Sequence, residues 1–431
     1  MNNTKGIPLV SEMSKSAKTY TLLVLTIVYA FNFIDRQILV ILQPLLKAEL
    51  GLSDTQLGLL SGFSFAIFYT ALGIPIARLA DRHNRRNIIA IALTVWSGMT
   101  ALSGMTQNFF QLLLARMGVG VGEAGGSPPA HSMISDMYEP RRRATALAIY
   151  SAGLYLGVMI GYSSGGILGE MYGWRTTFFI VGIPGVILAL LLRFTVKEPP
   201  RGLYDTGPDV APPSVKDTLK YVWRLKSFPY IAFGCAMSAF VSYGTSNFMP
   251  GFMIRYHGIS LANIGVILGL LAGGGGMIGT FLGGFLTDKL GAKDPRWYLW
   301  LPGLSAVCAI PLALVTYHTS SREVMLVTYF IVVILSTFYL APAIAVTHRL
   351  VSPRMRALSS AILFFVLNLI GMGLGPVLVG AISDFELART GADGLRTALT
   401  IGTCIAIVKG YLFWMGGKKL PEDLSHQKRT E

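Results

Sequence analysis

Four charged residues interrupt long apolar stretches of the sequence. Asp35 and Arg36 lie in one stretch, and Arg116 and Glu123 lie in another. A charged side chain at the centre of a membrane helix costs at least ~2.5–3.5 kcal/mol on insertion scales, so such residues usually mark an ion pathway or a proton relay. Two acids and two bases are groups that can transfer protons or bind a charged ligand.

The spacing of three of these residues predicts a ladder of opposite charges. With a rise of 1.5 Å per residue, Asp35 lies about 12 Å before the end of its stretch and Arg116 about 10 Å after the start of its own. We expect these two boundaries to face the same side of the membrane, outside the cell, so the two side chains lie at similar depth. Glu123 follows Arg116 by seven residues, on the same helix face and about 10 Å deeper.

The ladder favours a proton relay. Burial raises the pKa of a carboxyl group and a nearby arginine lowers it, so a bound substrate or a conformational change can move a proton on or off. We predict that Asp35 takes up the proton, with Arg36 and Arg116 as competing partners, and that Glu123 passes it on or binds a cationic group. The alternative is a static salt bridge that only holds two helices together.

Several polar residues in apolar stretches are candidates for substrate binding. The arginines suit an anionic group, and the amides and phenol suit a polar head. The predicted set is Arg36, Arg116, Glu123, Asn32, Tyr243, Asn247 and Asn368. In the second half we expect Lys409 close to the end of its span and no charge at mid-depth. Because no nucleophile–base pair or metal-ligand spacing is present, we expect no enzyme activity, no metal and no cofactor.

The elements that position these residues are membrane-spanning helices. Of the 431 residues, 52% are hydrophobic and 13% charged, whereas soluble domains carry roughly 25% charged residues. Apolar stretches of about 20 residues, each long enough to cross a hydrocarbon core, recur along the chain. We predict an all-α integral membrane protein with twelve spans, at 20–43, 55–77, 87–106, 109–137, 144–171, 174–194, 228–252, 260–287, 297–317, 323–348, 356–383 and 397–415.

A polar segment divides the twelve spans into two sets of six. The segment from Glu198 to Lys226 contains five prolines, which is typical of a linker. We therefore predict an N-terminal six-helix bundle at 1–196, a cytoplasmic linker at 197–227 and a C-terminal six-helix bundle with a tail at 228–431.

Two charged segments occur once in each half. Arg78–Arg82 recurs as Phe285–Lys289, and Pro140–Ala144 recurs as Pro353–Ala357. Such a repeat is typical of transporters built from two related halves. An aspartate at a helix end can pair with an arginine or a helix N-terminus of the opposite half, and the alternative is a solvated loop charge. The predicted gating residues are Asp81, Arg85, Asp288, Arg142 and Arg356.

Glycines at one-turn spacing in the fifth and eleventh spans indicate close helix contact. Gly153, Gly157 and Gly161 belong to the first group, and Gly371 and Gly375 to the second. Small residues at this spacing let helices approach closely in lipid. Both a sliding interface between halves and plain tight packing agree with the pattern.

The distribution of basic residues predicts the orientation. The net charge is +14, and most lysines and arginines fall in loops on one side of the predicted spans. This bias places both termini in the cytoplasm. We expect the protein to lie in the inner membrane of the cell. The basic balance therefore reports topology and does not indicate a nucleic-acid partner.

One loop and three shorter segments resemble a known transporter family. Ala77–Arg86, with the sequence A-R-L-A-D-R-H-N-R-R, resembles the loop signature G-x-L-A-D-R-x-G-R-K of the major facilitator superfamily. Within that superfamily, Asp35–Arg36, Arg116–Ala124 and Lys197–Gly202 resemble the spinster branch. The resemblance implies two six-helix bundles around a central cavity, alternating access and coupling to protons. In animal members it also implies transport of lysophospholipids or sphingosine-1-phosphate.

We therefore predict a proton-coupled secondary active transporter that moves an amphipathic lysophospholipid or sphingoid-type lipid. Its partners would be this substrate, protons and the surrounding membrane lipids, and we expect a monomer. One alternative is a proton-coupled carrier of a small organic anion, because arginines serve both substrates. The other is a membrane receptor or sensor that keeps the fold but does not transport.

Overall fold

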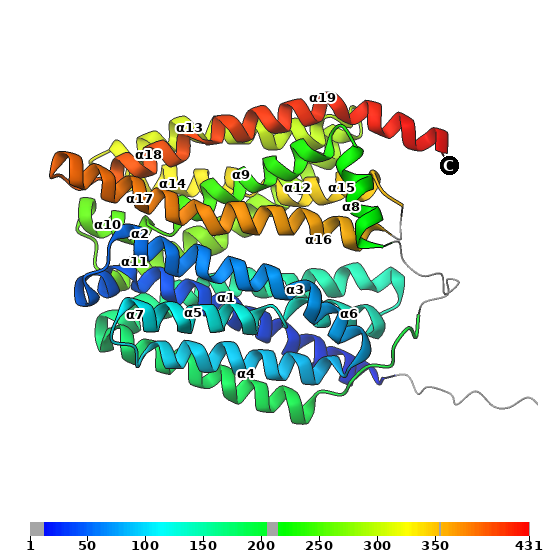
Figure 1. Cartoon of the computed structure of the whole chain (residues 1–431), viewed down its shortest axis with the longest axis horizontal. Helices are drawn as coiled ribbons and strands as arrows, with labels where there is room; N and C mark the ends of the chain where they lie inside the picture. Colours follow the sequence, from blue (N-terminus) through cyan, green and yellow to red (C-terminus); the bar gives the residue numbers. More distant parts are fainter. Residues whose placement is uncertain (1–12, 205–213, 353–354, 431) are drawn as a thin grey trace, which may run out of the picture.

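The computed structural model describes residues 13–204, 214–352 and 355–430, and this part of the chain is helical with short turns between helices (Figure 1). The first half holds α1 (Lys15–Leu50), α2 (Asp54–Gly58), η1 (Leu59–Phe63), α3 (Ser64–Arg82), α4 (Arg85–Ser103), α5 (Phe109–Glu123), α6 (Ser127–Met137) and α7 (Pro140–Thr195). Here η denotes a π-helical turn.

The second half begins after the linker. It holds α8 (Val215–Arg224), α9 (Phe228–Ser246), α10 (Met249–His257), α11 (Leu261–Leu268), η2 (Gly269–Gly274), α12 (Gly275–Gly291), α13 (Trp297–His318), α14 (Arg322–Ser336), α15 (Leu340–Arg349), α16 (Arg356–Val366), η4 (Leu367–Met372), α17 (Gly373–Thr390), α18 (Leu395–Cys404) and α19 (Ala406–Thr430).

Together these segments form the twelve predicted membrane helices. Consecutive pieces such as α2–η1–α3 continue one another, and α7 holds both the fifth and the sixth span. Gly173 divides α7 with a φ of 75°, a value that glycine adopts without the steric cost of a side chain. By length and composition, eight helices in the described part of the chain are long and apolar enough to cross a membrane.

Local sequence explains the break in the fourth span. α5 ends at Glu123, and α6 starts at Ser127 with prolines in its first turn. Pro128 and Pro129 have no backbone N–H, so they are tolerated at a helix start and would interrupt a helix interior. The intervening Gly125 and Gly126 complete the turn, which leaves Glu123 at a helix end inside the bundle.

The glycines singled out in the sequence pack helices within one half. A Cβ on Gly157 would lie 2.3 Å from the carbonyl oxygen of Ala30 in α1, and one on Gly153 would lie 2.5 Å from that of Thr26. Gly371 likewise lies against α9, where Ala239 is its neighbour. These positions therefore serve tight packing rather than contact between the halves.

Other glycines join the two halves along two seams. In the first, α2 and η1 pack against α17, and a Cβ on Gly58 would lie 2.3 Å from the carbonyl oxygen of Pro376. In the second, α7 packs against α11 and η2, where Gly166 and Gly265 face each other. π-Helical turns η1, η2 and η4 lie at these seams. A π-helical turn inserts a residue into the helix and permits a local bend.

The two ends of the bundle differ in their chain connections. The described chain begins and ends at one end, called here the terminal end, at the right of Figure 1. The opposite end, called here the far end, holds the turn at 51–53 and the turns at 258–260 and 391–394.

Candidate transport site and gates

The sequence-predicted charges meet inside the first bundle. Nε of Arg36 in α1 donates a hydrogen bond of 2.7 Å to Oε2 of Glu123 in α5, and Nη2 lies 2.7 Å from the same oxygen in an ion pair. The Glu123 side chain is fully buried and that of Arg36 is 15% exposed. Removing one partner of such a pair leaves an uncompensated buried charge, so the pair fixes α1 against the end of α5.

Three aromatic rings surround the Arg36 guanidinium. Its central carbon lies 5.0 Å from the ring centroid of Phe33, 4.5 Å from that of Phe65 and 5.1 Å from that of Tyr69. Rings at these distances attract a cation through their electron-rich faces. The aromatic cage and Glu123 together hold Arg36 in place.

Asp35 and Arg116 are both buried, and their polar atoms are incompletely bonded. Within the described chain, both Asp35 carboxylate oxygens lack a hydrogen-bond partner, as do Nε and Nη1 of Arg116. The hydroxyl groups of Ser97 and Thr100 in α4 face the Asp35 carboxylate, and Arg116 and Glu123 are its charged neighbours. The structure thus brings the three ladder residues together. It differs from the expected arrangement in that Arg36 pairs with Glu123 and not with Asp35.

Two of the four charges line a cavity that both halves share. Its walls include Arg36 and Arg116 from the first half and Tyr243, Ser246 and Asn247 from the second. The enclosed volume is about 50 Å³, which is room for a few water molecules.

The remaining substrate candidates lie at different distances from this cavity. Asn32 is buried beside Glu123. Asn368 lies in η4 and is not among the residues that line the cavity. Lys409 corrects an expectation: it is 4% exposed and lines a second cavity inside the second half, so buried charge is not confined to the first half.

In this conformation, the predicted latch residues at the terminal end form no hydrogen bond or ion pair with the opposite half among the described residues. Asp81, Asp288, Arg142 and Arg356 are all exposed. Asp288 accepts a hydrogen bond of 3.0 Å from the hydroxyl of Tyr298 in its own half, and Arg356 donates to the carbonyl of His348. Of the repeated segment Pro353–Ala357, residues 353–354 lie outside the described residues.

Arg85 belongs to a buried network within the first half. Its guanidinium donates to the carboxylates of Asp136 in α6 and Glu198 in the linker, and to the hydroxyl of Ser132. The Arg85 side chain is 1% exposed. This network fastens the start of the linker to the first bundle, so Arg85 does not reach the second half here.

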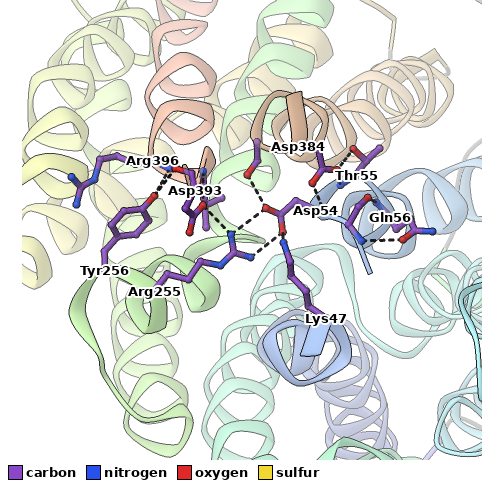
Figure 2. Close-up of polar contacts among 12 residues, drawn as sticks. Lys47, Asp54, Thr55, Gln56, Arg255, Tyr256, Asp384, Asp393 and Arg396 are labelled. Atoms are coloured by element: carbon purple, nitrogen blue, oxygen red, sulfur yellow. Dashed lines mark hydrogen bonds and ion pairs between the residues drawn. The ribbon is translucent and has the colours of Figure 1, made fainter. Parts of the chain in front are cut away.

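Sequence reasoning missed a polar cluster at the far end, centred on Asp54 (Figure 2). The Asp54 carboxylate accepts hydrogen bonds from Nη1 and Nη2 of Arg255 in α10, at 3.1 and 2.9 Å, and from the Ser383 hydroxyl in α17, at 2.7 Å. Lys47 of α1 adds an ion pair of 2.5 Å. Asp54 is 2% exposed, and its bonds to Arg255 and Ser383 join the two halves.

A second carboxylate of this cluster caps a helix of the opposite half. Asp384 in α17 accepts hydrogen bonds from the backbone N–H groups of Asp54 and Thr55, at 2.9 and 2.8 Å, and from the Thr55 hydroxyl. The first N–H groups of a helix have no partner within the helix, and a carboxylate there also complements the helix dipole. α17 thus closes the N-terminus of α2 across the seam.

Further contacts between the halves continue along the second seam. Glu170 at the far end accepts a 2.6 Å hydrogen bond from the backbone N–H of Ala262, and Tyr155 bonds to Thr280 nearer the middle. In the sequence, only the local pattern Ser53-Asp54-Thr55-Gln56 points to the Asp54 cluster, and this pattern is typical of an ordinary helix start.

The fold has twelve membrane helices in two halves that share repeated segments, with a charged cavity between the halves. These features define a multi-pass membrane transporter. The chain belongs to the major facilitator superfamily, whose family model matches residues 25–376. It is therefore a secondary transporter of that superfamily and not an enzyme.

Its relatives differ in what they carry. An "MFS-type efflux pump" of Mycolicibacterium smegmatis is 35% identical over 94% of each chain. A "Hexuronate transporter" of Bacillus subtilis is 26% identical over 92% of this chain and 95% of its own. The crystal structure of a bacterial homologue of the human lysosomal transporter spinster, inward-facing and unoccupied, has a TM-score of 0.87 at 32% identity and covers 95% of this chain and 99% of its own. The predicted family and its spinster branch are thus confirmed.

Proposed function

We propose that the protein is a proton-coupled transporter of an amphipathic lysophospholipid or sphingoid-type lipid, working by alternating access. The supporting observation is the buried Asp35 carboxylate, which lacks a hydrogen-bond partner in the described chain and has Arg116 as a charged neighbour, which itself lines the cavity shared by both halves. A carboxylate that is poorly solvated takes up a proton more readily than one in water.

Charge balance links the proton to the substrate. With all four groups ionised, Asp35, Arg36, Arg116 and Glu123 sum to zero. Because Glu123 already neutralises Arg36, a proton on Asp35 leaves the charge of Arg116 unmatched. An anionic head group entering the cavity would then find a free cation, so proton binding and head-group binding favour each other.

The seams support a rocking motion of two units. We propose that residues 1–196 and 228–431 move as bundles about the central cavity, joined by the linker at 197–227. The far end is sealed by the Asp54 cluster, and the similar spinster homologue is inward-facing. We infer that the terminal end faces the cytoplasm of the cell, as the basic loops predict, and that Asp81 and Asp288 latch that end when the far end opens.

Flux measurements in proteoliposomes test the coupling. The wild-type protein should take up labelled lysophosphatidic acid faster when a pH gradient is imposed. Asp35→Asn keeps the shape of the side chain but cannot exchange a proton, so its flux should no longer respond to the gradient. Asp217→Asn removes an exposed carboxyl of α8 and should behave like the wild type. Normal pH dependence in Asp35→Asn would refute the relay.

A small organic anion is the second candidate substrate. The unmatched charge of Arg116 suits a carboxylate as well as a phosphate head, and the chain is similar to a hexuronate transporter. The same proteoliposomes should therefore be tested with labelled glucuronate. Flux of glucuronate without lysolipid flux would favour this candidate, and the absence of both fluxes would refute both substrate classes.

A further inference from the structure

A second cavity lies inside the second bundle, among α9, α13, α14, α18 and α19. Its volume is about 60 Å³, slightly larger than that of the central cavity. It does not adjoin the four charges of the first bundle, because its lining residues all belong to the second half. Binding in this cavity is separate from the proton coupling at Asp35.

Lys409 of α19 supplies the charge of this cavity. The residue is 4% exposed and lines the cavity wall. Its ammonium group forms no ion pair or hydrogen bond with any residue in the described ranges, and the ring centroid of Tyr339 lies 5.4 Å from Nζ. Taking an ammonium group out of water costs several kcal/mol unless a counter-charge offsets the loss. The site therefore favours an anion.

Hydroxyl groups line the same cavity and supply uncharged donors. Ser242 and Ser246 lie one helical turn apart on α9, and Thr403 lies on α18. The hydroxyls of Ser242 and Ser246 donate to no described residue, whereas Ser238 and Ser336 bond to carbonyls of their own helices. A cation with the two hydroxyls of Ser242 and Ser246 is a donor set that matches the oxygens of a carboxylate.

Ser246 connects this cavity to the central one, because it lines both. The size of the cavity suits a small group of a few heavy atoms.

We propose that the Lys409 cavity is a carboxylate-binding site in the second bundle, where the ammonium group and the hydroxyls of Ser242 and Ser246 bind the two oxygens. The carboxylate belongs either to a small polar acid or to the head of an acid with an apolar tail. Both kinds of acid would place a carboxylate beside Lys409. They differ in the rest of the molecule, which would occupy the central cavity.

Calorimetric titration of the purified full-length protein in lipid nanodiscs tests this site. The probes are sodium glucuronate, a polar acid, and sodium hexanoate, an acid with an apolar tail, with hexanol as the uncharged match to hexanoate. Lys409→Met removes the charge and keeps the length of the side chain. Lys418→Met, nine residues further along α19 and exposed, is the matched control.

We expect the wild type and Lys418→Met to bind at least one acid, and Lys409→Met to bind it about tenfold to a hundredfold more weakly, the range for a hydrogen bond to a charged group. Ser242→Ala should weaken binding about threefold to tenfold, and it carries the test if Lys409→Met does not give monodisperse protein. Binding of glucuronate identifies a polar acid, and binding of hexanoate alone identifies an apolar one. Equal affinity in Lys409→Met and the wild type, or equal binding of hexanol and hexanoate, would overturn the proposal.

Discussion

Replacing Asp54 by asparagine should open the far end of the transporter. The substitution keeps the shape of the side chain and removes its charge. Across the seam, Asp54 accepts two hydrogen bonds from Arg255 and one from Ser383. Its ion pair with Lys47 lies within the first half, so the loss of that pair does not act on the seam directly.

The size of the effect follows from these contacts. A hydrogen bond between charged groups contributes roughly 1.5–3 kcal/mol, and a bidentate pair with arginine lies at the strong end. Arg255 is 23% exposed, so water recovers part of the loss. We therefore expect the far-end contact to weaken by about 2–3 kcal/mol, which changes the ratio of open to closed molecules about 30- to 150-fold.

Pulsed electron–electron double resonance measures this ratio directly. In a variant without the native cysteines, spin labels at the exposed positions Ala48 and Ala392 report the separation of the halves at the far end. Asp54→Asn should add a long-distance population. Asp393→Asn is the matched control, because Asp393 bonds to Arg255 at 3.3 Å within the second half. If Asp54→Asn and the wild type give the same distance distribution, Asp54 does not hold the seam.

Two further substitutions probe packing and the linker. Gly380→Ala would place a Cβ 2.2 Å from the carbonyl oxygen of Asp54, so the seam must shift at a cost of about 1–3 kcal/mol. The spin labels at Ala48 and Ala392 should therefore move apart. Gly73→Ala is the control, because open space surrounds Gly73 and the label distance should not change. Arg85→Met leaves the buried carboxylate of Asp136 unpaired and should lower the free energy of unfolding by about 3 kcal/mol. Thermal unfolding in nanodiscs measures this loss, and a melting temperature equal to that of the exposed-residue control Arg141→Met would contradict it.

The sequence predicts the four central charges because charge inside an apolar stretch is conspicuous. It does not predict that Arg36 pairs with Glu123, since that depends on how α1 and α5 are rotated about their axes. Lys409 was placed too near a helix end for a related reason. α19 continues to Thr430, well past Met415 where the predicted span ends, and Leu420 in this extension is buried, so Lys409 lies away from the C-terminal end of the helix.

The glycine pattern shows where periodicity stops being informative. Gly153 and Gly157 lie at the spacing that favours close contact, and they do pack closely, but against α1 of their own half. Gly58 and Gly62 have the same spacing of four residues, yet they pack against α17 and η4 of the opposite half. Which neighbour a small residue meets is decided by the arrangement of the bundles and not by the helix that carries it.

The cap that Asp384 provides for α2 makes opening of the far end depend on water. While the halves are in contact, the first N–H groups of α2 and this carboxylate satisfy one another. When they separate, each must be hydrated in its place, because a helix end left without partners in a dry seam is strongly unfavourable. Opening therefore takes up several water molecules in every cycle. Solutes that lower water activity should accordingly slow the step that exposes this helix end.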